Sequence, residues 1–307
     1  MSAKHPILGV TGSSGAGTST AMTVFKRMFS ALRLNAALVE GDAFHAYDRE
    51  EHNKVLQRAI IRGENFSLFG PAGNHLERLE KLLRDYGESG TGTIRRYLHT
   101  EAEGIAAGQP AGTFTPWEDL PEDTDVLFYE GLHGGYVSDD TDIAQHMDLL
   151  IGVVPVINLE WIQKLRRDTW DRGREAEDVT RTILRRMPDY VTHITPQFSR
   201  TDVNFQRVPL VDTSNPFTVR QVPTAEESLV VIHFNEQSRI RYDLDGLARA
   251  IKGAFKSNPK TLVTPGPAMA RAMELILAPA IETLAHNRRR ALTRDIDPLT
   301  PTHRNRR

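Results

Sequence analysis

The sequence of 307 residues contains no cysteine. Disulfide bonds, thiolate metal sites, cysteine nucleophiles and thiol redox switches are therefore excluded together. No run of apolar residues approaches the roughly 18–20 that a membrane helix needs, and the first residues do not have the pattern of a signal peptide. We therefore expect a cytoplasmic protein that does not bind membranes.

The sequence also lacks a large excess of either charge, with 38 Lys and Arg against 40 Asp and Glu. Residues 286–307 nevertheless carry seven Arg and two Asp, a net charge of +5, so the rest of the chain carries −7. An acidic body argues against nonspecific binding of nucleic acid. We interpret residues 1–285 as a single domain and residues 286–307 as a basic, flexible C-terminal tail.

Short apolar strands alternate with amphipathic helices along the chain. Strands are predicted at 6–10, 36–39, 126–129, 149–157 and 229–234. Helices are predicted at 19–34, 76–86, 159–172, 176–187 and 268–286, and a loop at 104–125. This alternation predicts an α/β fold of three layers, with a mainly parallel sheet between helices. The β-rich stretch after Phe205 predicts some antiparallel edge strands.

A glycine-rich segment follows the first predicted strand. Its sequence GSSGAGTS fits G-x-x-x-x-G-[KT]-[ST], in which backbone N–H groups surround nucleotide phosphates and a hydroxyl binds Mg²⁺. The predicted ATP-binding residues are Gly12, Ser13, Ser14, Gly15, Ala16, Gly17, Thr18, Ser19 and Thr20, with Ser19 as a Mg²⁺ ligand. Thr18 stands where a lysine is usual, so another cation must stabilise the charge of phosphoryl transfer.

Two carboxylates follow predicted strands directly. Asp42 comes after the second strand and Glu130 after the third. Ligands of open parallel sheets bind at the carboxyl ends of the strands, so both acids should lie beside the phosphate loop. Glu130 after an apolar strand is typical of a Mg²⁺ ligand. Asp42 is the candidate general base for an attacking hydroxyl.

A basic cluster occupies the helix predicted at 159–172. Lys164, Arg167, Asp168 and Arg172 recur at a spacing that places them on one helix face. Such a face is usually only solvated, but the phosphate loop needs a cation, and a phosphorylated substrate needs arginines. A second set of anion- or hydroxyl-binding candidates lies in predicted loops: His45, Arg49, Tyr97 and His99.

These motifs together resemble bacterial phosphoribulokinase. The resemblance extends from about residue 5 to residue 284 and is carried by GSSGAGTST, EGDAFH with Arg49, YLHT, LFYEGLHG, VVPVINLEWIQKLRRD with Arg172-Gly173, ITPQFSRTDVNFQRVP and VDTSNPF. It implies a P-loop kinase with a nucleoside-monophosphate-kinase-like fold. The implied activity is ATP-dependent phosphorylation of D-ribulose 5-phosphate at O1, which supplies the Calvin cycle, and the implied assembly is a homo-oligomer, typically an octamer.

The resemblance also implies roles for individual residues. Asp42 would be the catalytic base, Ser19 and Glu130 would serve Mg²⁺, and Asp168 would be a second essential acid. Ribulose 5-phosphate or the transferred phosphate would be bound by His45, Arg49, His99, Lys164, Arg167 and Arg172, with Lys164 as the missing cation. The thiol pair that regulates chloroplast-type relatives is excluded, because the chain has no cysteine.

Three departures from the family pattern are visible. Glu175 replaces a usual Ser or Thr, and the lysine usual after Arg49 is either Lys54 in a shifted register or absent. Bacterial members are commonly activated by NADH and inhibited by AMP through arginines between subunits. Three of those positions hold Ala31, His233 and Asn258 here, and Arg186 alone is retained as a candidate allosteric residue. We therefore expect NADH activation to be weak or lost.

Two other functions remain open on the sequence. A related P-loop kinase, similar to uridine kinase or pantothenate kinase, would act on another hydroxyl; a nucleoside acceptor would favour aromatic residues where this chain has cationic groups. A nucleotide sensor without turnover would not need the base Asp42. Comparing ribulose 5-phosphate, ribose 5-phosphate and uridine as acceptors separates the three.

Overall fold

The computed structural model describes residues 3–13, 17–171, 173–218 and 221–296, apart from the side chains of Ser19, Asp171 and residues 294–296. The strands are β1 (Ile7–Thr11), β2 (Ala36–Glu40), β3 (Thr93–Ile94), β4 (Glu118–Asp119), β5 (Val126–Gly131), β6 (Leu149–Val154), β7 (Val203–Pro209), β8 (Ser228–Phe234), β9 (Phe255–Asn258) and β10 (Thr261–Pro265). The helices are α1 (Thr18–Leu32), α2 (Arg49–Arg62), α3 (Leu76–Ser89), α4 (Glu101–Ala107), α5 (Ile157–Arg166), α6 (Ala176–Asp189), α7 (Leu244–Ala250) and α8 (Met269–Ile296).

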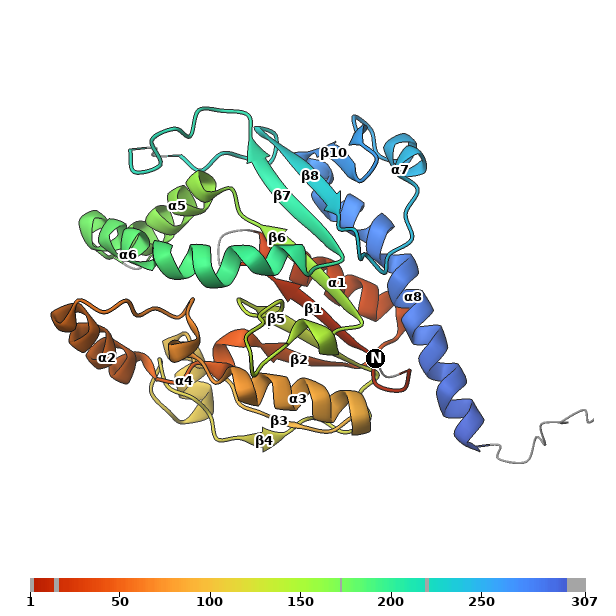
Figure 1. The fold of residues 1–307 in the computed structure, drawn as a ribbon, viewed down its shortest axis with the longest axis horizontal. Coiled ribbons are helices and arrows are strands. Elements are labelled where there is room, and N and C mark those ends of the chain that lie inside the picture. The colour runs from red at the N-terminus through yellow and green to blue at the C-terminus, as the bar shows by residue number, and fades with distance from the viewer. Residues whose placement is uncertain (1–2, 14–16, 172, 219–220, 297–307) are drawn as a thin grey trace, which may run out of the picture.

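The central sheet has eight strands in the order β2-β5-β1-β6-β7-β8-β10-β9 (Figure 1). The strands from β2 to β7 in this order are parallel. The remaining strands β8, β10 and β9 are each antiparallel to their neighbours. The predicted mainly parallel sheet with antiparallel edge strands is confirmed.

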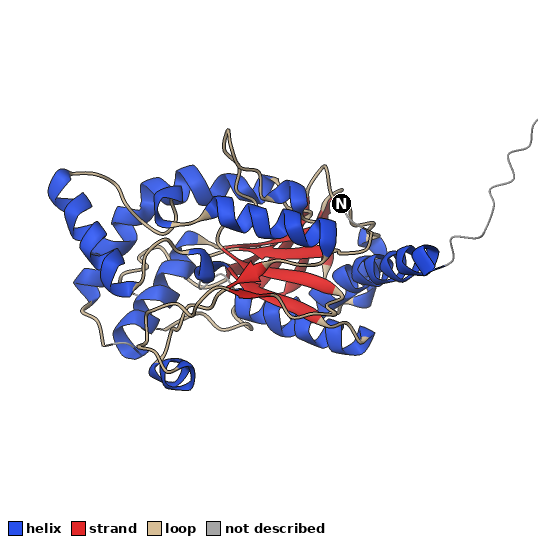
Figure 2. Ribbon diagram, turned by 90° about the horizontal axis from the view of Figure 1, so that it is seen from below, coloured by secondary structure: helices blue, strands red, loops and turns tan. Residues whose placement is uncertain are grey.

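Helices cover both faces of the sheet (Figure 2). Alternate residues of β5 point to opposite faces, and they enter two different cores. Phe128 packs with Phe25 of α1, at 4.5 Å between ring centroids, in a core that also includes α8. Tyr129 lies in a second core with Leu83 and Tyr86 of α3. The layers are therefore α1 with α8, the sheet, and α3.

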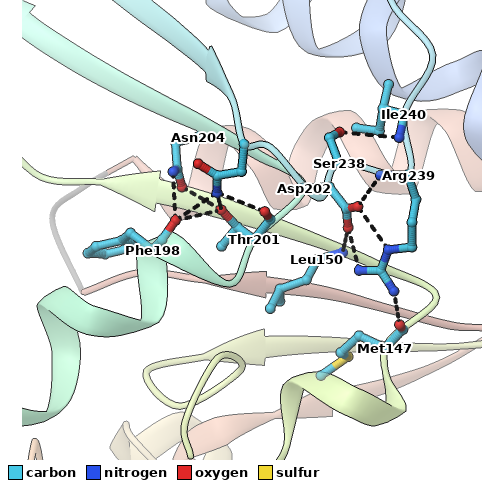
Figure 3. A network of polar contacts seen from close by, with 10 residues as sticks. Met147, Leu150, Phe198, Thr201, Asp202, Asn204, Ser238, Arg239 and Ile240 are labelled. Atoms are coloured by element: carbon cyan, nitrogen blue, oxygen red, sulfur yellow. Dashed lines mark hydrogen bonds and ion pairs between the residues drawn. The ribbon is translucent and has the colours of Figure 1, made fainter. Parts of the chain in front are cut away.

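The buried carboxylate of Asp202 links the segments at the amino-terminal ends of β6 and β7 (Figure 3). Asp202, directly before β7, accepts hydrogen bonds from the backbone N–H of Leu150 at 2.8 Å and of Arg239 at 2.7 Å. The Arg239 guanidinium adds Nε at 2.8 Å and bonds the Met147 carbonyl. The network joins β6, β7 and the segment after β8.

The structure corrects four predicted elements. β6 ends at Val154 instead of residue 157, because Pro155 has no N–H for a strand ladder. The helix predicted at 159–172 becomes α5 followed by a π-helical turn, Arg167–Asp171. The loop predicted at 104–125 contains the end of α4 and the short strand β4.

The fourth correction concerns the C-terminal segment. α8 passes the predicted end at residue 286 and reaches Ile296, and Arg288 forms an ion pair with Asp125 at 2.7 Å. The predicted start of the basic tail therefore lies inside a helix that contacts the body of the protein. Residues 297–307 lie outside the described residues. Among the helices that the structure describes, none has the length and apolarity to cross a membrane.

Candidate active site

A cavity of about 630 Å³ lies at the carboxyl ends of the parallel strands. The register sets Glu40 of β2 beside Glu130 of β5, and Glu130 beside Val10 of β1, so these strand ends meet at one edge. Beyond this edge lie α5 and α6 on one side and α2 and α4 on the other (Figure 1). The cavity therefore has the position that the sequence predicted for ligand binding.

Most of the predicted site residues line this cavity. They are Gly12, Ser13, Thr18, Asp42, His45, Tyr97, His99, Glu130, Lys164, Arg167 and Asp168. Gly17, Thr20 and Arg49 are not part of its wall. Ser14, Gly15, Ala16, Arg172 and the Ser19 side chain lie outside the described residues.

The two described glycines of the predicted phosphate loop, Gly12 and Gly17, occupy positions that require glycine. A Cβ on Gly12 would lie 2.6 Å from the Val153 carbonyl oxygen, so the position accepts no side chain. Gly17 has φ of 111°, in the left-handed region that favours glycine. α1 begins directly afterwards at Thr18. Its N-terminal N–H groups provide a site for an anion at this end of the cavity.

Asp42 lies in the 3₁₀ turn Gly41–Phe44 that follows β2. Its Oδ1 is 3.2 Å from Nε2 of His45, and its Oδ2 is 3.7 Å from Nε2 of His99. Burial alone would raise the pKa of Asp42. The hydrogen bond and charge of His45, with the charges of His99 and His133, outweigh burial and lower the pKa. Asp42 is therefore an ionised carboxylate at neutral pH, able to accept a proton.

Glu130 shows where a cation would fit. Burial and the negative charge of Asp42 raise the pKa of Glu130 to about 7, although the neighbouring Thr18 hydroxyl lowers it. A divalent cation here would relieve this repulsion. The described residues include no group of three or more His, Asp or Glu that could hold a metal alone. The arrangement suits Mg²⁺, which binds through one or two carboxylates together with substrate phosphates and water.

Asp168 is the centre of a cationic cluster on the opposite wall. Its side chain is completely buried and accepts hydrogen bonds from Lys164 Nζ at 2.9 Å and Arg167 Nε at 3.1 Å. Arg174 adds an ion pair at 3.5 Å. Burial alone would raise the pKa of Asp168, but Lys164 and Arg167 outweigh it and lower the pKa. Burial and the nearby Arg186 lower the pKa of Lys164 to about 8.

Three further residues of this wall were not predicted as active-site residues. Arg174 reaches Asp168 because the π-helical turn shifts the spacing that follows α5. Glu160 lies on α5, one turn before Lys164, and lines the cavity. Arg186, the candidate allosteric residue, comes from α6 and also lines it, near the ring of Phe69. Only the packing of α5 against α6 brings Arg186 here, and no sequence motif signals that packing.

Arginines also hold the loops that carry the histidines. Arg49 donates to the His99 carbonyl at 3.0 Å, so it supports a site residue without lining the cavity. Arg95 donates from Nε to the Ala43 carbonyl at 2.8 Å and from its NH2 group to the His45 carbonyl at 2.6 Å. Its guanidinium stacks 3.6 Å from the centroid of the Phe114 ring. The two hydrogen bonds of Arg95 therefore hold the turn that contains Asp42.

The ring of Tyr97 completes this side of the cavity. It makes edge contacts with both histidines, at 6.1 Å from His45 and 4.9 Å from His99 between ring centroids. The cavity thus combines an anion-binding loop, an ionised carboxylate between two imidazoles, and a cluster of cations. These are the groups that phosphoryl transfer to a hydroxyl requires: a phosphate site, a base and stabilisation of charge.

Comparison with known proteins agrees with this chemistry. The model of the Phosphoribulokinase / Uridine kinase family matches residues 7–214. The chain is 52% identical to a probable phosphoribulokinase of Escherichia coli (strain K12) over 289 residues, which are 94% of this chain and 99% of the relative. It is 53% identical to the plasmid-encoded phosphoribulokinase of Cupriavidus necator over 292 residues, which are 95% of this chain and 99% of the relative.

The structural comparison gives the same result. The solved structure of phosphoribulokinase from Rhodobacter spheroides is similar with a TM-score of 0.85 and 45% sequence identity, and the match covers 94% of this chain and 100% of that one. The expected P-loop kinase fold is therefore confirmed. This chain belongs to the phosphoribulokinase/uridine kinase family.

Proposed function

We propose that this chain is a phosphoribulokinase that transfers the γ-phosphoryl group of ATP to O1 of D-ribulose 5-phosphate. The observation that carries the proposal is the position of Asp42: an ionised carboxylate in a cavity that also contains the phosphate loop and the Lys164–Asp168 cluster. The names of the relatives at about half identity over nearly their whole length support this substrate.

The reaction follows from the placement of these groups. Asp42 accepts the proton of the O1 hydroxyl as the oxygen attacks the γ-phosphorus. The new O–P bond forms, the bond between the γ-phosphorus and the β,γ-bridging oxygen breaks, and ADP leaves. Lys164 and Arg167 stabilise the negative charge on the transferred group. A general base of this kind contributes on the order of 10²–10⁴-fold in rate.

The nucleotide and the metal would be held at the phosphate-loop end. Gly12, Ser13 and Thr18, which line the cavity, would contact the phosphates of ATP. Ser19 and Glu130 would hold Mg²⁺, which would offset the negative charge of the nucleotide phosphates.

The cations of the opposite wall favour a phosphorylated acceptor. Lys164, Arg167, Arg174 and Arg186 line one cavity, and arginines bind phosphate oxygens with paired hydrogen bonds. A nucleoside would bring no charge to offset these cations. A cytoplasmic homo-oligomer, expected from the family resemblance, stays a prediction.

The test is a comparison of acceptors in one assay. ADP formation would be measured with ribulose 5-phosphate, ribose 5-phosphate and uridine, with Mg²⁺ and ATP in excess, and the product identified by phosphorus NMR. We expect ribulose 1,5-bisphosphate to form and the other acceptors to react far more slowly. Faster ADP formation with uridine than with the sugar phosphates would indicate a nucleoside kinase. No ADP formation with any acceptor would favour a nucleotide sensor.

A further inference from the structure

Asn74 contacts the histidine beside the proposed base. Its side chain is buried, and its Nδ2 donates two hydrogen bonds, to the Leu68 carbonyl at 3.0 Å and to the Gly70 carbonyl at 2.8 Å. Both hydrogens of the amide nitrogen are thus used, which fixes the orientation of the amide. The remaining atom, Oδ1, lies 2.8 Å from Nδ1 of His45.

This contact determines where His45 carries a proton. An amide oxygen can only accept a hydrogen bond, so Nδ1 of His45 must donate. The other ring nitrogen, Nε2, lies 3.2 Å from Oδ1 of Asp42. Because an ionised carboxylate only accepts, Nε2 must carry a proton as well in order to bond it. The three side chains form a continuous series of contacts, from Asn74 through His45 to Asp42.

We propose that Asn74 is a positioning residue for the kinase reaction: it fixes the ring and the Nδ1 proton of His45, and His45 thereby orients the carboxylate of Asp42. The inference rests on the proposed function, in which Asp42 is the base. With Oδ1 occupied by His45, Oδ2 is the oxygen left to accept the proton of the sugar hydroxyl. Without Asn74, the His45 ring has no fixed acceptor and the base loses its orientation.

The surrounding backbone supports this role. The segments that carry His45 and Asn74 pair as a short antiparallel bridge, with Ala46 N–H donating to Gly73 at 2.9 Å and His75 N–H donating to Phe44 at 2.7 Å. The two side chains are therefore held opposite each other by backbone bonds. A substitution at Asn74 removes the side-chain contact while this pairing stays in place.

The first test is the protonation of His45 in the wild-type protein, measured by nitrogen-15 NMR of the histidine side chains with H45Q to assign the signal. We expect a proton on both ring nitrogens, with Nδ1 donating to Asn74 and Nε2 donating to Asp42. An unprotonated Nδ1 would overturn the proposal. This measurement does not depend on turnover, so an inactive enzyme with a protonated Nδ1 refutes the proposed function and leaves the assigned contact intact.

The second test is a double-mutant cycle of N74A with H45A. We expect N74A to lower kcat roughly 10- to 100-fold with an unchanged KM for ATP, and to lower it by less than about threefold in the H45A background. An equal loss in both backgrounds would contradict the proposal, because Asn74 would then not act through His45. N204A is the matched control: Asn204 also donates to a backbone carbonyl, that of Phe198, at 2.8 Å. Its side-chain partners Phe198 and Thr201 do not line the cavity, whereas the partner of Asn74, His45, does. We expect the kcat of N204A to be unchanged.

Discussion

Oδ1 of Asp42 lies 3.2 Å from Nε2 of His45. His99 approaches Oδ2 from the other side, at 3.7 Å. The backbone N–H of His99 donates to Oε2 of Glu103 at 2.6 Å, next to the capping box that Thr100 and Glu103 form at the start of α4. The carboxylate therefore sits between two imidazoles that separate structural elements hold in place. This arrangement explains how the pKa of Asp42 stays low although burial opposes it.

Lys164 predicts an alkaline limit of activity. Its pKa is lowered to about 8 by burial and by Arg186, so the protonated, active form is lost as the pH rises through 8. We expect kcat/KM to fall about tenfold per pH unit above that value. The arginine of K164R stays protonated over the whole pH range of the assay. The kcat/KM of K164R should therefore not fall above pH 8, even if its value is lower than that of the wild type. A K164R profile that coincides in shape with the wild-type profile would exclude Lys164 as the titrating group.

We expect Arg95 to affect kcat although it does not line the cavity. R95A removes two hydrogen bonds to the backbone of the turn that carries Asp42, and a small displacement of a base lowers kcat by roughly 10²-fold. R78A is the control, because Arg78 lies over the Trp117 ring at 5.1 Å, as Arg95 does at 4.8 Å, but it is exposed and the bonds to the turn come from Arg95. We expect guanidinium ion to restore part of the R95A rate. Equal kinetics of R95A and R78A would show that the turn does not depend on Arg95.

Arg186 tests whether the retained arginine is regulatory or catalytic. Because it lines the cavity, we expect R186Q to lower kcat/KM for ribulose 5-phosphate about 10- to 100-fold without any effector, as for a lost charge-assisted hydrogen bond. R181Q on the same helix, where Arg181 pairs with Asp178 on the surface, should have no effect. Assays with and without NADH complete the test, since an R186Q enzyme with normal basal kinetics and an altered NADH response would assign Arg186 to regulation.

Asp202 predicts a loss of stability. D202A removes the buried carboxylate that accepts hydrogen bonds from the Arg239 guanidinium and from two backbone N–H groups, and each buried donor left without an acceptor costs about 1–3 kcal/mol. E236A is the control, because the ion pair of Glu236 with Lys260 at 2.7 Å is on the surface and such pairs contribute little. Urea unfolding gives both values. Similar midpoints for D202A and E236A would contradict the role assigned to Asp202.

The sheet was predictable because its central strands are buried on both faces. The run Val126–Tyr129 is apolar without alternation, as a parallel strand between helices must be. The helix after β6 was predicted too long, because nothing in the local sequence marks the π-helical turn at Arg167. α4 was missed although Thr100 and Glu103 form a capping box that the sequence shows. The part of α8 beyond residue 286 was missed, and in it Arg288 pairs with Asp125, which is far away in the chain.

The site was predictable where one motif or one strand end determines the position. The glycine-rich pattern that begins at Gly12 is local in the sequence, and Asp42 and Glu130 follow strands whose ends must meet. Arg186 and Asn74 required the structure, because their partners lie on segments whose packing no local pattern encodes.

The most direct test of the account is the rate of D42N with ribulose 5-phosphate. Asn keeps the shape of the side chain but cannot take the proton of the sugar hydroxyl. We expect kcat to fall on the order of 10²–10⁴-fold, with the KM for ATP unchanged and an unchanged melting temperature. A D42N enzyme with the wild-type kcat would contradict the account, because the carboxylate between His45 and His99 would then not be the base.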